Sequence, residues 1–323
     1  MENGYPIQPQ VAYRTRAGIC LHGHAEEVLE SPLADSFRGK IDLIFTSPPF
    51  PLNRKKKYDN KQGDAYVVWL KAFAPLFKRF LSPTGSIVME VGNSWEPGRP
   101  VMSTLALESL LAFLRTGRLH LCQQFVWHNP ARLPSPAQWV TVERIRLKDS
   151  YTHLWWMSPT ERPKADNRRV LVEYSKSMKH LLKTKSYNAG RRPSEHYIGK
   201  TSFLNNHDGA IPPSVLKMDH HDGNERDSPS NLITMANTHA STAYQKFCRD
   251  HGIDPHPARM PTGLAEFFIK FLTEPGDLVL DPFGGSNTTG GAAEKLKRRW
   301  ISIEPNPVYI EGSRGRFSTI REK

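Results

Sequence analysis

Residues 277–290 read Asp-Leu-Val-Leu-Asp-Pro-Phe-Gly-Gly-Ser-Asn-Thr-Thr-Gly, and this stretch decides the fold class. Its first five residues are an apolar run bounded by aspartates, which is typical of a buried strand. A glycine-rich turn follows, and residues 292–296 have the composition of a helix. Strand, turn and helix together place backbone N–H groups and a helix N-terminus beside a polar ligand. We therefore predict an α/β protein with a ligand-binding loop at the end of a strand.

A carboxylate ends the next predicted strand. Residues 300–303 read Trp-Ile-Ser-Ile and lead to Glu304, which lies 20 residues after Gly284. At about this spacing an acidic side chain reaches ribose hydroxyls in nucleotide-binding α/β folds. The loop lacks the Gly-Lys-Ser/Thr of a P-loop and the Gly-x-Gly-x-x-Gly of dinucleotide sites. The pattern therefore indicates a ligand with a ribose and disfavours a nucleoside triphosphate or a dinucleotide.

A second motif, Thr-Ser-Pro-Pro-Phe at residues 46–50, follows the apolar strand pattern of residues 41–45. Proline fixes φ and lacks a backbone N–H, so the first proline ends the strand and the pair forms a stiff corner. The corner lies at the edge of a parallel sheet, where open α/β folds bind ligands. A planar amine, such as the amino group of a base, would bond to Ser47 and the Pro48 carbonyl while its ring stacks on Phe50. A plain loop after a strand is the alternative.

These two motifs and Glu304 resemble those of DNA methyltransferases that modify amino groups and use S-adenosyl-L-methionine. Serine before Pro-Pro resembles the N4-cytosine branch, since adenine-N6 members more often carry Asp-Pro-Pro-Tyr. The catalytic motif precedes the cofactor loop, as in the circularly permuted beta order of the family. Residues 256–261 and 127–136 match the family as well. The resemblance implies a Rossmann-like methyltransferase fold with a mostly parallel sheet and a target-recognition insert.

The resemblance gives each matched position an expected role. The catalytic corner would comprise Ser47, Pro48, Pro49 and Phe50. The cofactor would be bound by Asp281, Phe283, Gly284, Gly285, Ser286, Asn287, Thr288, Glu304 and Pro261. Within this set Asp281 would lie near the amino group of the cofactor, Asn287 and Thr288 near its carboxylate, and Glu304 at its ribose.

One position departs from the family pattern. Members usually carry Gly-Asp near the N-terminus, where the aspartate contacts the adenine of the cofactor. Here His24 follows Gly23 instead. Either Glu26 takes over this contact or it is missing, so the adenine pocket stays open at this point.

The implied reaction follows from the chemistry of cytosine. Its amino group shares a lone pair with the ring and is a poor nucleophile. Hydrogen bonds from both protons to Ser47 and the Pro48 carbonyl would draw the nitrogen toward tetrahedral geometry, so that positioning drives an in-line transfer. Ser47 or water would carry off the released proton. The base must leave the duplex to react, which costs about a few kcal/mol.

Three other functions fit parts of the pattern. An adenine-N6 methyltransferase would share nearly all of these motifs. A methyltransferase of RNA or protein would share the cofactor site but would need neither the base-stacking corner nor a basic insert. A non-catalytic DNA-binding regulator would bind no cofactor, and the completeness of the motifs argues against it.

The distribution of charge favours double-stranded DNA as the partner. The 323-residue chain carries a net charge of +12, and its pI is about 9.6. Residues 131–200 hold 15 Lys or Arg and 6 Asp or Glu, a net charge of +9. A merely soluble basic protein is the alternative, but this clustering suits contact with phosphates. The predicted DNA-binding residues are Arg54, Lys55, Lys56, Lys57, Arg144, Arg146, Arg191 and Arg192.

Periodicity divides the chain into four segments. We expect a polar tail at 1–15, the catalytic half of the methyltransferase domain at 16–127, and its cofactor-binding half at 256–323. Between them, residues 128–255 lose the α/β rhythm and are expected to form the target-recognition insert. The amphipathic pattern predicts helices at 65–80 and 104–114, and apolar runs predict strands at 86–91 and 123–127.

Other classes of protein are disfavoured. The three cysteines are far apart and show no metal-ligand spacing, and no Pro-Cys dipeptide supports attack on a ring carbon of cytosine. We expect no metal and no membrane span, and a cytoplasmic, nucleoid-associated protein of a prokaryote.

A cognate restriction endonuclease is the partner that the resemblance implies. Similarity to one family member around 127–149 suggests a short palindromic target with an internal cytosine, with CAGCTG as the hypothesis; monomer and dimer both stay open.

Overall fold

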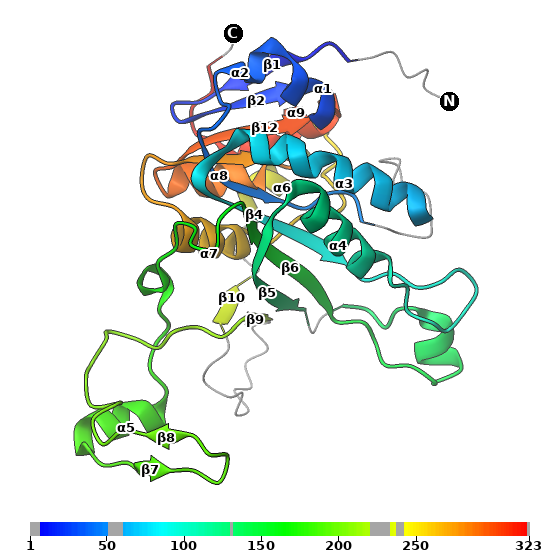
Figure 1. The fold of residues 1–323 in the computed structure, drawn as a ribbon. Helices are drawn as coiled ribbons and strands as arrows, with labels where there is room; N and C mark the ends of the chain where they lie inside the picture. Colours follow the sequence, from blue (N-terminus) through cyan, green and yellow to red (C-terminus); the bar gives the residue numbers. More distant parts are fainter. Residues whose placement is uncertain (1–6, 51–60, 130–131, 220–232, 237–241, 322–323) are drawn as a thin grey trace.

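The computed structural model describes residues 7–50, 61–129, 132–219, 233–236 and 242–321 (Figure 1). A central sheet of ten strands dominates this part of the chain. The strands are β1 (Gln10–Arg14), β2 (Gly18–His22), β3 (Ile41–Thr46), β4 (Leu81–Gly92), β5 (His120–His128), β6 (Tyr151–Ser158), β9 (Val215–Asp219), β10 (Ile233–Ala236), β11 (Leu278–Asp281) and β12 (Arg299–Glu304).

The order of strands across the sheet is β1-β2-β12-β11-β3-β4-β6-β5-β9-β10. The neighbours from β2 to β4 run parallel, whereas β6 runs antiparallel to both β4 and β5. The chain leaves β11 toward β12 and leaves β3 toward β4, in opposite directions across the sheet. This reversal puts a switch point between the carboxyl ends of β11 and β3, where open α/β sheets bind ligands. The predicted fold class, a mostly parallel Rossmann-like sheet, is confirmed.

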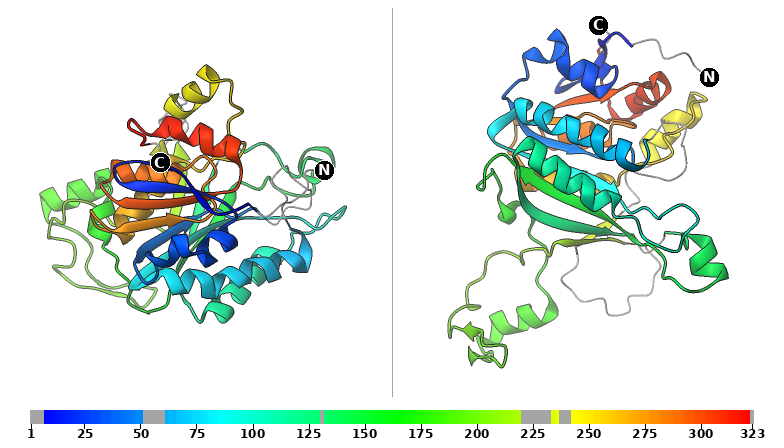
Figure 2. Two further views of the ribbon diagram at one scale, coloured as in Figure 1. Left: turned by 90° about the horizontal axis from the view of Figure 1, so that it is seen from above. Right: turned by 45° about the vertical axis from the view of Figure 1, so that its right-hand side comes forward.

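Helices cover both faces of the sheet (Figure 2). On one face lie α1 (Ala25–Glu30), α2 (Pro32–Asp35), α3 (Gly63–Phe80) and α4 (Leu105–Gly117). On the other lie α6 (Thr242–Asp250), α7 (Thr262–Leu272), α8 (Thr288–Lys295) and α9 (Pro307–Ser313). Each face has its own apolar core, so the described residues form a three-layer α/β/α arrangement.

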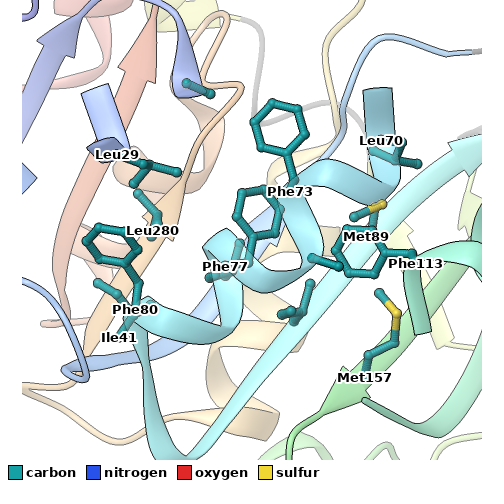
Figure 3. Close-up of a cluster of buried hydrophobic side chains, with 14 of the residues drawn as sticks. Leu29, Ile41, Leu70, Phe73, Phe77, Phe80, Met89, Phe113, Met157 and Leu280 are labelled. Carbon is teal, nitrogen blue, oxygen red and sulfur yellow. The ribbon is translucent and has the colours of Figure 1, made fainter. Parts of the chain in front are cut away.

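The helix α3 shows why the sequence folds in this way. Its buried side chains include Tyr66, Leu70, Phe73 and Phe77, spaced three or four residues apart on one face of the helix. Figure 3 shows this face packed against strand residues such as Met89 of β4. Each fully buried aromatic or aliphatic side chain contributes about 1.5–3 kcal/mol. This packing fixes the strand β3 beside β4 and thereby holds the corner that follows β3.

Four strands of the sheet, β1, β6, β9 and β10, lie where the sequence predicted other structure. β1 belongs to the sheet and pairs with β2, although residues 1–15 were predicted to be a polar tail. β6 lies between β4 and β5, although it falls inside the segment 128–255 that lacked an α/β rhythm. Nearly all of β6 is buried because its side chains pack against both apolar cores, Trp155 on one face and Trp156 on the other. The segment 128–255 is therefore not one continuous insert, and its role in target recognition stays a prediction.

Two regions project from the sheet (Figure 1). One holds α5 (Lys176–Thr184) and the short strands β7 (Gly190–Arg191) and β8 (Tyr197–Ile198), which form a separate two-stranded sheet. We call residues 176–204 the helix–hairpin lobe. The other lies around the π-helical turn Gln138–Val142, which follows β5 in the chain. The π-helical turn and all but the last residues of the lobe fall within the basic segment 131–200 identified from the sequence.

Candidate active site

A cavity of about 550 Å³ opens at the switch point between β11 and β3. The predicted residues that line it are Ser47, Pro48, Pro49, Phe50, Asp281, Phe283, Gly284, Gly285, Ser286, Thr288 and Glu304. The two sequence motifs thus meet although more than 200 residues separate them, because their strands are neighbours in the sheet. Most of the predicted catalytic and cofactor residues share one cavity.

Asp281 ties the corner to the glycine loop. Its Oδ1 accepts hydrogen bonds from Thr46 Oγ1 at 2.8 Å and from the Phe283 backbone N–H at 3.1 Å. Its Oδ2 accepts one from Thr289 Oγ1 at 2.7 Å. Burial raises the pKa of this carboxyl, while the three hydrogen bonds favour its ionised form. Asp281 therefore fixes the end of β3 against α8 and places a carboxyl group at the wall of the cavity.

The glycine loop leaves room for a ligand against its backbone. A Cβ on Gly284 would lie 2.0 Å from Ser302 Oγ, so a larger residue there would clash with the Ser302 side chain. Gly285 has φ +51°, a conformation that glycine adopts without strain. Its N–H donates to Glu304 Oε2 at 2.8 Å. The loop therefore folds tightly over the ends of β11 and β12, and its backbone faces the cavity.

Glu304 is a buried acid at the end of β12. Its other oxygen, Oε1, accepts a hydrogen bond from the Asn306 backbone N–H at 2.9 Å. Burial raises the pKa of Glu304 to about 7, and these two backbone hydrogen bonds oppose the rise. A carboxylate has about four acceptor sites, so each oxygen can accept a further hydrogen bond from hydroxyls in the cavity. The loop, the acid and the cavity fit the nucleoside part of S-adenosyl-L-methionine.

Two predicted cofactor residues do not line the cavity. The Asn287 side chain turns inward: its Oδ1 accepts from the Gly290 N–H at 3.1 Å and its Nδ2 donates to Tyr13 at 3.0 Å. It caps α8, which explains its left-handed backbone with φ 54°. Pro261 is buried at the N-terminus of α7, and its neighbour Met260 lines the cavity instead. For both residues the cofactor contact was assigned by motif position alone.

The two residues considered for the adenine contact lie away from the cavity. His24 is exposed at the N-terminus of α1, and neither it nor Glu26 lines the cavity. Next to Glu304, Pro305 and Tyr309 line it instead. The ring of His256 lies over Gly285 and meets the Tyr309 ring edge to face, with centroids 4.4 Å apart. These flat side chains offer a surface against which a purine can stack.

Glu90 is a site residue that the sequence interpretation missed. It lies in β4, is 4% exposed and lines the cavity beside Ser47. It is hydrogen-bonded to Ser47, and its Oε1 accepts from Thr152 Oγ1 at 3.2 Å. Burial raises the pKa of Glu90 to about 7, while these hydrogen bonds and the Arg132 guanidinium oppose the rise. The signal in the sequence was a lone glutamate inside the apolar strand pattern of residues 86–91.

The position of the Phe50 ring depends on Gly92, which has no side chain. A Cβ on Gly92 would lie 2.5 Å from Phe50 Cδ2, well inside contact distance. The ring of Phe50 therefore packs directly on the end of β4, and Phe50 lines the cavity. Glycine at this position sets the place of the ring.

We predict that Gly92→Ala slows methyl transfer about 5- to 150-fold, because it displaces Phe50 and weakens stacking that is worth about 1–3 kcal/mol. Single-turnover transfer at saturating DNA and cofactor measures this effect. Cofactor affinity should stay within about twofold, since Gly92 lies away from the glycine loop. Equal rates for Gly92→Ala and the unaltered protein would rule out a role for the position of Phe50.

Among the predicted DNA-binding residues that the structure describes, Arg144, Arg146, Arg191 and Arg192, none lines the cavity. Arg54, Lys55, Lys56 and Lys57 fall outside the described residues. Arg144 and Arg146 are exposed beside the π-helical turn, where Arg146 donates to the Pro100 and Ile145 carbonyls. Arg191 and Arg192 belong to the helix–hairpin lobe.

Other features of the described residues are plain. The three cysteines are free, and Cys20 and Cys248 are buried. Across the described ranges, no group of three or more His, Cys, Asp or Glu side chains is placed to hold a metal ion. No helix in the part of the chain that the structure covers is long and apolar enough to cross a membrane.

Comparison with known proteins gives the family. The type II methyltransferase M.PvuII of Proteus hauseri is 42% identical over 308 residues, 95% of this chain and 85% of that protein. M.BglII of Bacillus subtilis is 23% identical over 284 residues, 86% of this chain and 64% of that protein.

Solved structures agree. The structure titled PvuII DNA methyltransferase (cytosine-N4-specific) superposes with a TM-score of 0.71 at 36% identity, covering 96% of this chain and 89% of that one. The protein TTHA0409 of Thermus thermophilus, solved in complex with S-adenosyl-L-methionine, shares the fold with a TM-score of 0.52 at 18% identity, covering 91% and 90% of the two chains. The DNA methylase family N6_N4_Mtase matches residues 41–314, and this chain belongs to that family.

Proposed function

We propose that this chain is a modification methyltransferase that transfers a methyl group from S-adenosyl-L-methionine to the N4 amino group of a flipped cytosine in duplex DNA. One observation carries the proposal. Ser47, which is hydrogen-bonded to the buried acid Glu90, lines the same cavity as the glycine loop and Glu304. The similarity to M.PvuII over 95% of the chain supports the same activity.

The corner holds the amino group of the base. An ionised Glu90 carboxylate can accept hydrogen bonds but cannot donate them. The Ser47 hydroxyl therefore donates its proton to Glu90, and its oxygen lone pairs stay available to the amino group of the base. The two amino protons bond to Ser47 Oγ and to the Pro48 carbonyl, which orients the nitrogen lone pair toward the methyl group. Phe50 stacks on the ring and offsets part of the cost of flipping the base, about a few kcal/mol.

The same corner takes the proton that transfer releases. The methylated amine carries one proton too many, which passes to Ser47 while the Ser47 proton passes to Glu90. The raised pKa of Glu90, about 7, suits an acceptor at neutral pH. Bound S-adenosyl-L-methionine supplies an electrophilic methyl group on a sulfonium ion. The glycine loop and Glu304 hold its nucleoside part, and Asp281 offers negative charge to its amino group.

Adenine-N6 methylation remains the second candidate, since a flipped adenine also presents an amino group to Ser47 and Glu90. Serine rather than aspartate before Pro-Pro disfavours it, and so does the similarity to a cytosine-N4-specific enzyme. An enzyme acting on RNA or protein and a non-catalytic regulator are less well supported, because the cavity combines a base-stacking corner with a complete cofactor loop.

The experiment uses labelled S-adenosyl-L-methionine and duplexes that contain CAGCTG, the hypothesis for the target. One duplex carries the normal internal cytosine, and a second carries a pyrimidinone that lacks only its amino group. Label transfer to the first duplex alone supports the proposal. Equal transfer to both duplexes, or transfer only to RNA or protein, contradicts it. Ser47→Ala should lose transfer while it retains cofactor binding.

Recognition of DNA is proposed to lie in the parts of residues 128–255 that project from the sheet. Arg144, Arg146 and Arg191 are exposed there, Arg192 is half-buried beside them, and the basic run at 54–57 follows the catalytic corner in the sequence. Phosphate contacts of this kind position the duplex, and side chains in the same segment read the bases.

We predict that the double variant Arg191→Ala/Arg192→Ala lowers the slope of log affinity against log salt by about 1–2, because each lost phosphate contact retains about one counterion. Titration of duplex DNA at several salt concentrations measures the slope. Arg38→Ala is the matched control, since Arg38 is exposed, pairs with Asp35 and closely follows α2, which Figure 1 shows at the opposite end of the molecule from the lobe. An unchanged slope would remove the helix–hairpin lobe from the DNA interface.

The biological setting is part of the proposal. Relatives named as type II methyltransferases support a role beside a cognate restriction endonuclease that cuts the same sequence. Such an enzyme works in the prokaryotic cytoplasm, associated with the nucleoid. A short palindromic site allows a monomer to modify each strand in turn.

A further inference from the structure

Arg132 lines the cavity together with Ser47 and Glu90. Its side chain is 28% exposed, so the guanidinium is partly withdrawn from solvent at the wall of the site. It also lies close enough to Glu90 for its charge to act on that carboxyl. A cation therefore faces the place where the proposed function puts the amino group of the base, and the catalytic corner itself does not use it.

A chain of contacts fixes the position of Arg132. Its Nη1 donates to the Tyr151 carbonyl at 3.1 Å and lies 3.7 Å from Asp149 Oδ2. Asp149 Oδ1 in turn accepts from Asn93 Nδ2 at 3.0 Å, and Asn93 Oδ1 is 2.9 Å from His153 Nε2. Within the described residues, both of these side-chain contacts of Arg132 are made through Nη1, while an arginine carries donors on two further nitrogens. The side chain is thus held in one orientation with donors left for a ligand.

A second donor in the cavity wall points to the same kind of ligand. Trp127, at the end of β5, lines the cavity and is 8% exposed. Its Nε1 is buried and has no hydrogen-bond partner within the described residues. Burying an N–H without a hydrogen-bond partner destabilises the protein. An acceptor that enters with the substrate would remove this cost.

Cytosine offers such acceptors next to its reacting group. Its Watson–Crick edge carries the N4 amino donors, then the N3 and O2 acceptors. When the amino group is held at Ser47 and Glu90, N3 is the adjacent atom on the same edge. We propose that Arg132 donates to N3 and O2 of the flipped cytosine and selects this base. The inference rests on the proposed function. Thymine presents an N3–H that repels the guanidinium, and adenine has C2–H where cytosine has O2.

An experiment that alters both the protein and the target base tests this proposal. Single-turnover rates are measured at saturating enzyme and S-adenosyl-L-methionine on two duplexes. In one the target is deoxycytidine; in the other it is 3-deazadeoxycytidine, in which C–H replaces N3 while the amino group and O2 remain. The enzymes are the unaltered protein, Arg132→Ala, Arg132→Gln, Ser47→Ala and the exposed control Arg38→Ala.

We expect the ratio of the rates on cytosine and on the deaza base to fall about 10- to 100-fold in Arg132→Ala, since a good bidentate contact discriminates by about 1–3 kcal/mol. Comparing this ratio between the unaltered protein and each variant cancels any intrinsic difference in reactivity between the bases. Ser47→Ala should slow both reactions and keep the ratio, and Arg38→Ala should change neither. Arg132→Gln, which keeps one donor, should give an intermediate ratio and supplies the answer if Arg132→Ala does not fold.

An unchanged ratio in both Arg132 variants would overturn the inference. If, in addition, the salt dependence of DNA binding falls, Arg132 contacts a phosphate instead of the base. The proposed function fails separately: in that case the unaltered protein itself transfers no methyl group to deoxycytidine, and the inference falls with it.

Discussion

Glu90→Gln lowers the rate of methyl transfer about 10²- to 10⁴-fold at saturating DNA and cofactor, the usual effect of removing a positioned proton acceptor. The substitution keeps the size of the side chain but removes its charge and basicity. Ser47 then loses the partner that orients its hydroxyl and receives its proton. Cofactor affinity should hold, because no hydrogen bond links Glu90 to the glycine loop among the contacts found in the described residues. Single-turnover rates beside equilibrium binding of S-adenosyl-L-methionine separate the two effects.

The pH profile gives an independent test of the same residue. Glu90 must be ionised to accept a proton, and its pKa is raised to about 7. The single-turnover rate of the unaltered protein should therefore rise about tenfold per pH unit below pH 7 and level off above it. In Glu90→Gln this rise should disappear. A profile of the same shape in both proteins would assign the titration to another group.

As the pH rises toward 7, the free energy of unfolding should fall while the rate of methyl transfer rises. The folded protein holds the Glu90 proton up to about pH 7, whereas the unfolded chain releases it near the ordinary value of 4.5. The folded state binds more protons in this window, so its stability falls as pH rises from 4.5 to 7. The glutamine in Glu90→Gln does not titrate, so the variant does not lose stability in this way. Between pH 5 and pH 8 its free energy of unfolding should rise by up to about 3 kcal/mol relative to that of the unaltered protein. Denaturant unfolding at both pH values measures the difference, and a gain that does not depend on pH would contradict the burial of an ionisable Glu90.

Glu304→Ala is expected to weaken binding of S-adenosyl-L-methionine about 30- to 1000-fold. Two effects add: the carboxylate no longer accepts from the ribose hydroxyls, and the Gly285 and Asn306 N–H groups lose the oxygens that order the loop. Hydrogen bonds to a charged group are worth about 1.5–3 kcal/mol each. Isothermal titration with the cofactor or its demethylated product gives the affinity directly.

Glu26→Gln is the informative control for that experiment. The sequence left Glu26 as a candidate for the adenine contact, whereas the structure places it outside the cavity. The affinity of the Glu26→Gln variant for the cofactor should match that of the unaltered protein. A loss at Glu26 with no loss at Glu304 would place the cofactor elsewhere and contradict the assignment of the cavity.

Much of the fold could be predicted because its signals are local. The 3.6-residue period of α3, the apolar run of β11 and the glycine turn after it are each written in consecutive residues. The proline corner at 48–49 ends β3 for a reason that needs no tertiary information. Since parallel strands bring their carboxyl ends to one edge, even the meeting of the two motifs follows from the order of elements.

What the sequence missed depends on pairing across the sheet. β6 is antiparallel between β4 and β5, and no local pattern states that a segment flanked by proline-rich and basic residues enters the centre of the sheet. Glu90 stood out as a charge in an apolar strand, but its role depends on a contact with Ser47, more than 40 residues away. Asn287 shows the reverse error: a motif position suggested a ligand contact, and the polar side chain is used inside the fold as a helix cap.

The most direct test of the whole account is the identity of the methylated base. Duplex DNA is incubated with the protein and labelled S-adenosyl-L-methionine, digested to nucleosides and separated, and the mass and fragmentation of the labelled nucleoside are measured. The account predicts N4-methyldeoxycytidine from the unaltered protein and none from Glu90→Gln on the same time scale. N6-methyldeoxyadenosine as the labelled product would contradict the selection of cytosine by the corner and Arg132, and absence of any labelled nucleoside would contradict DNA as the substrate.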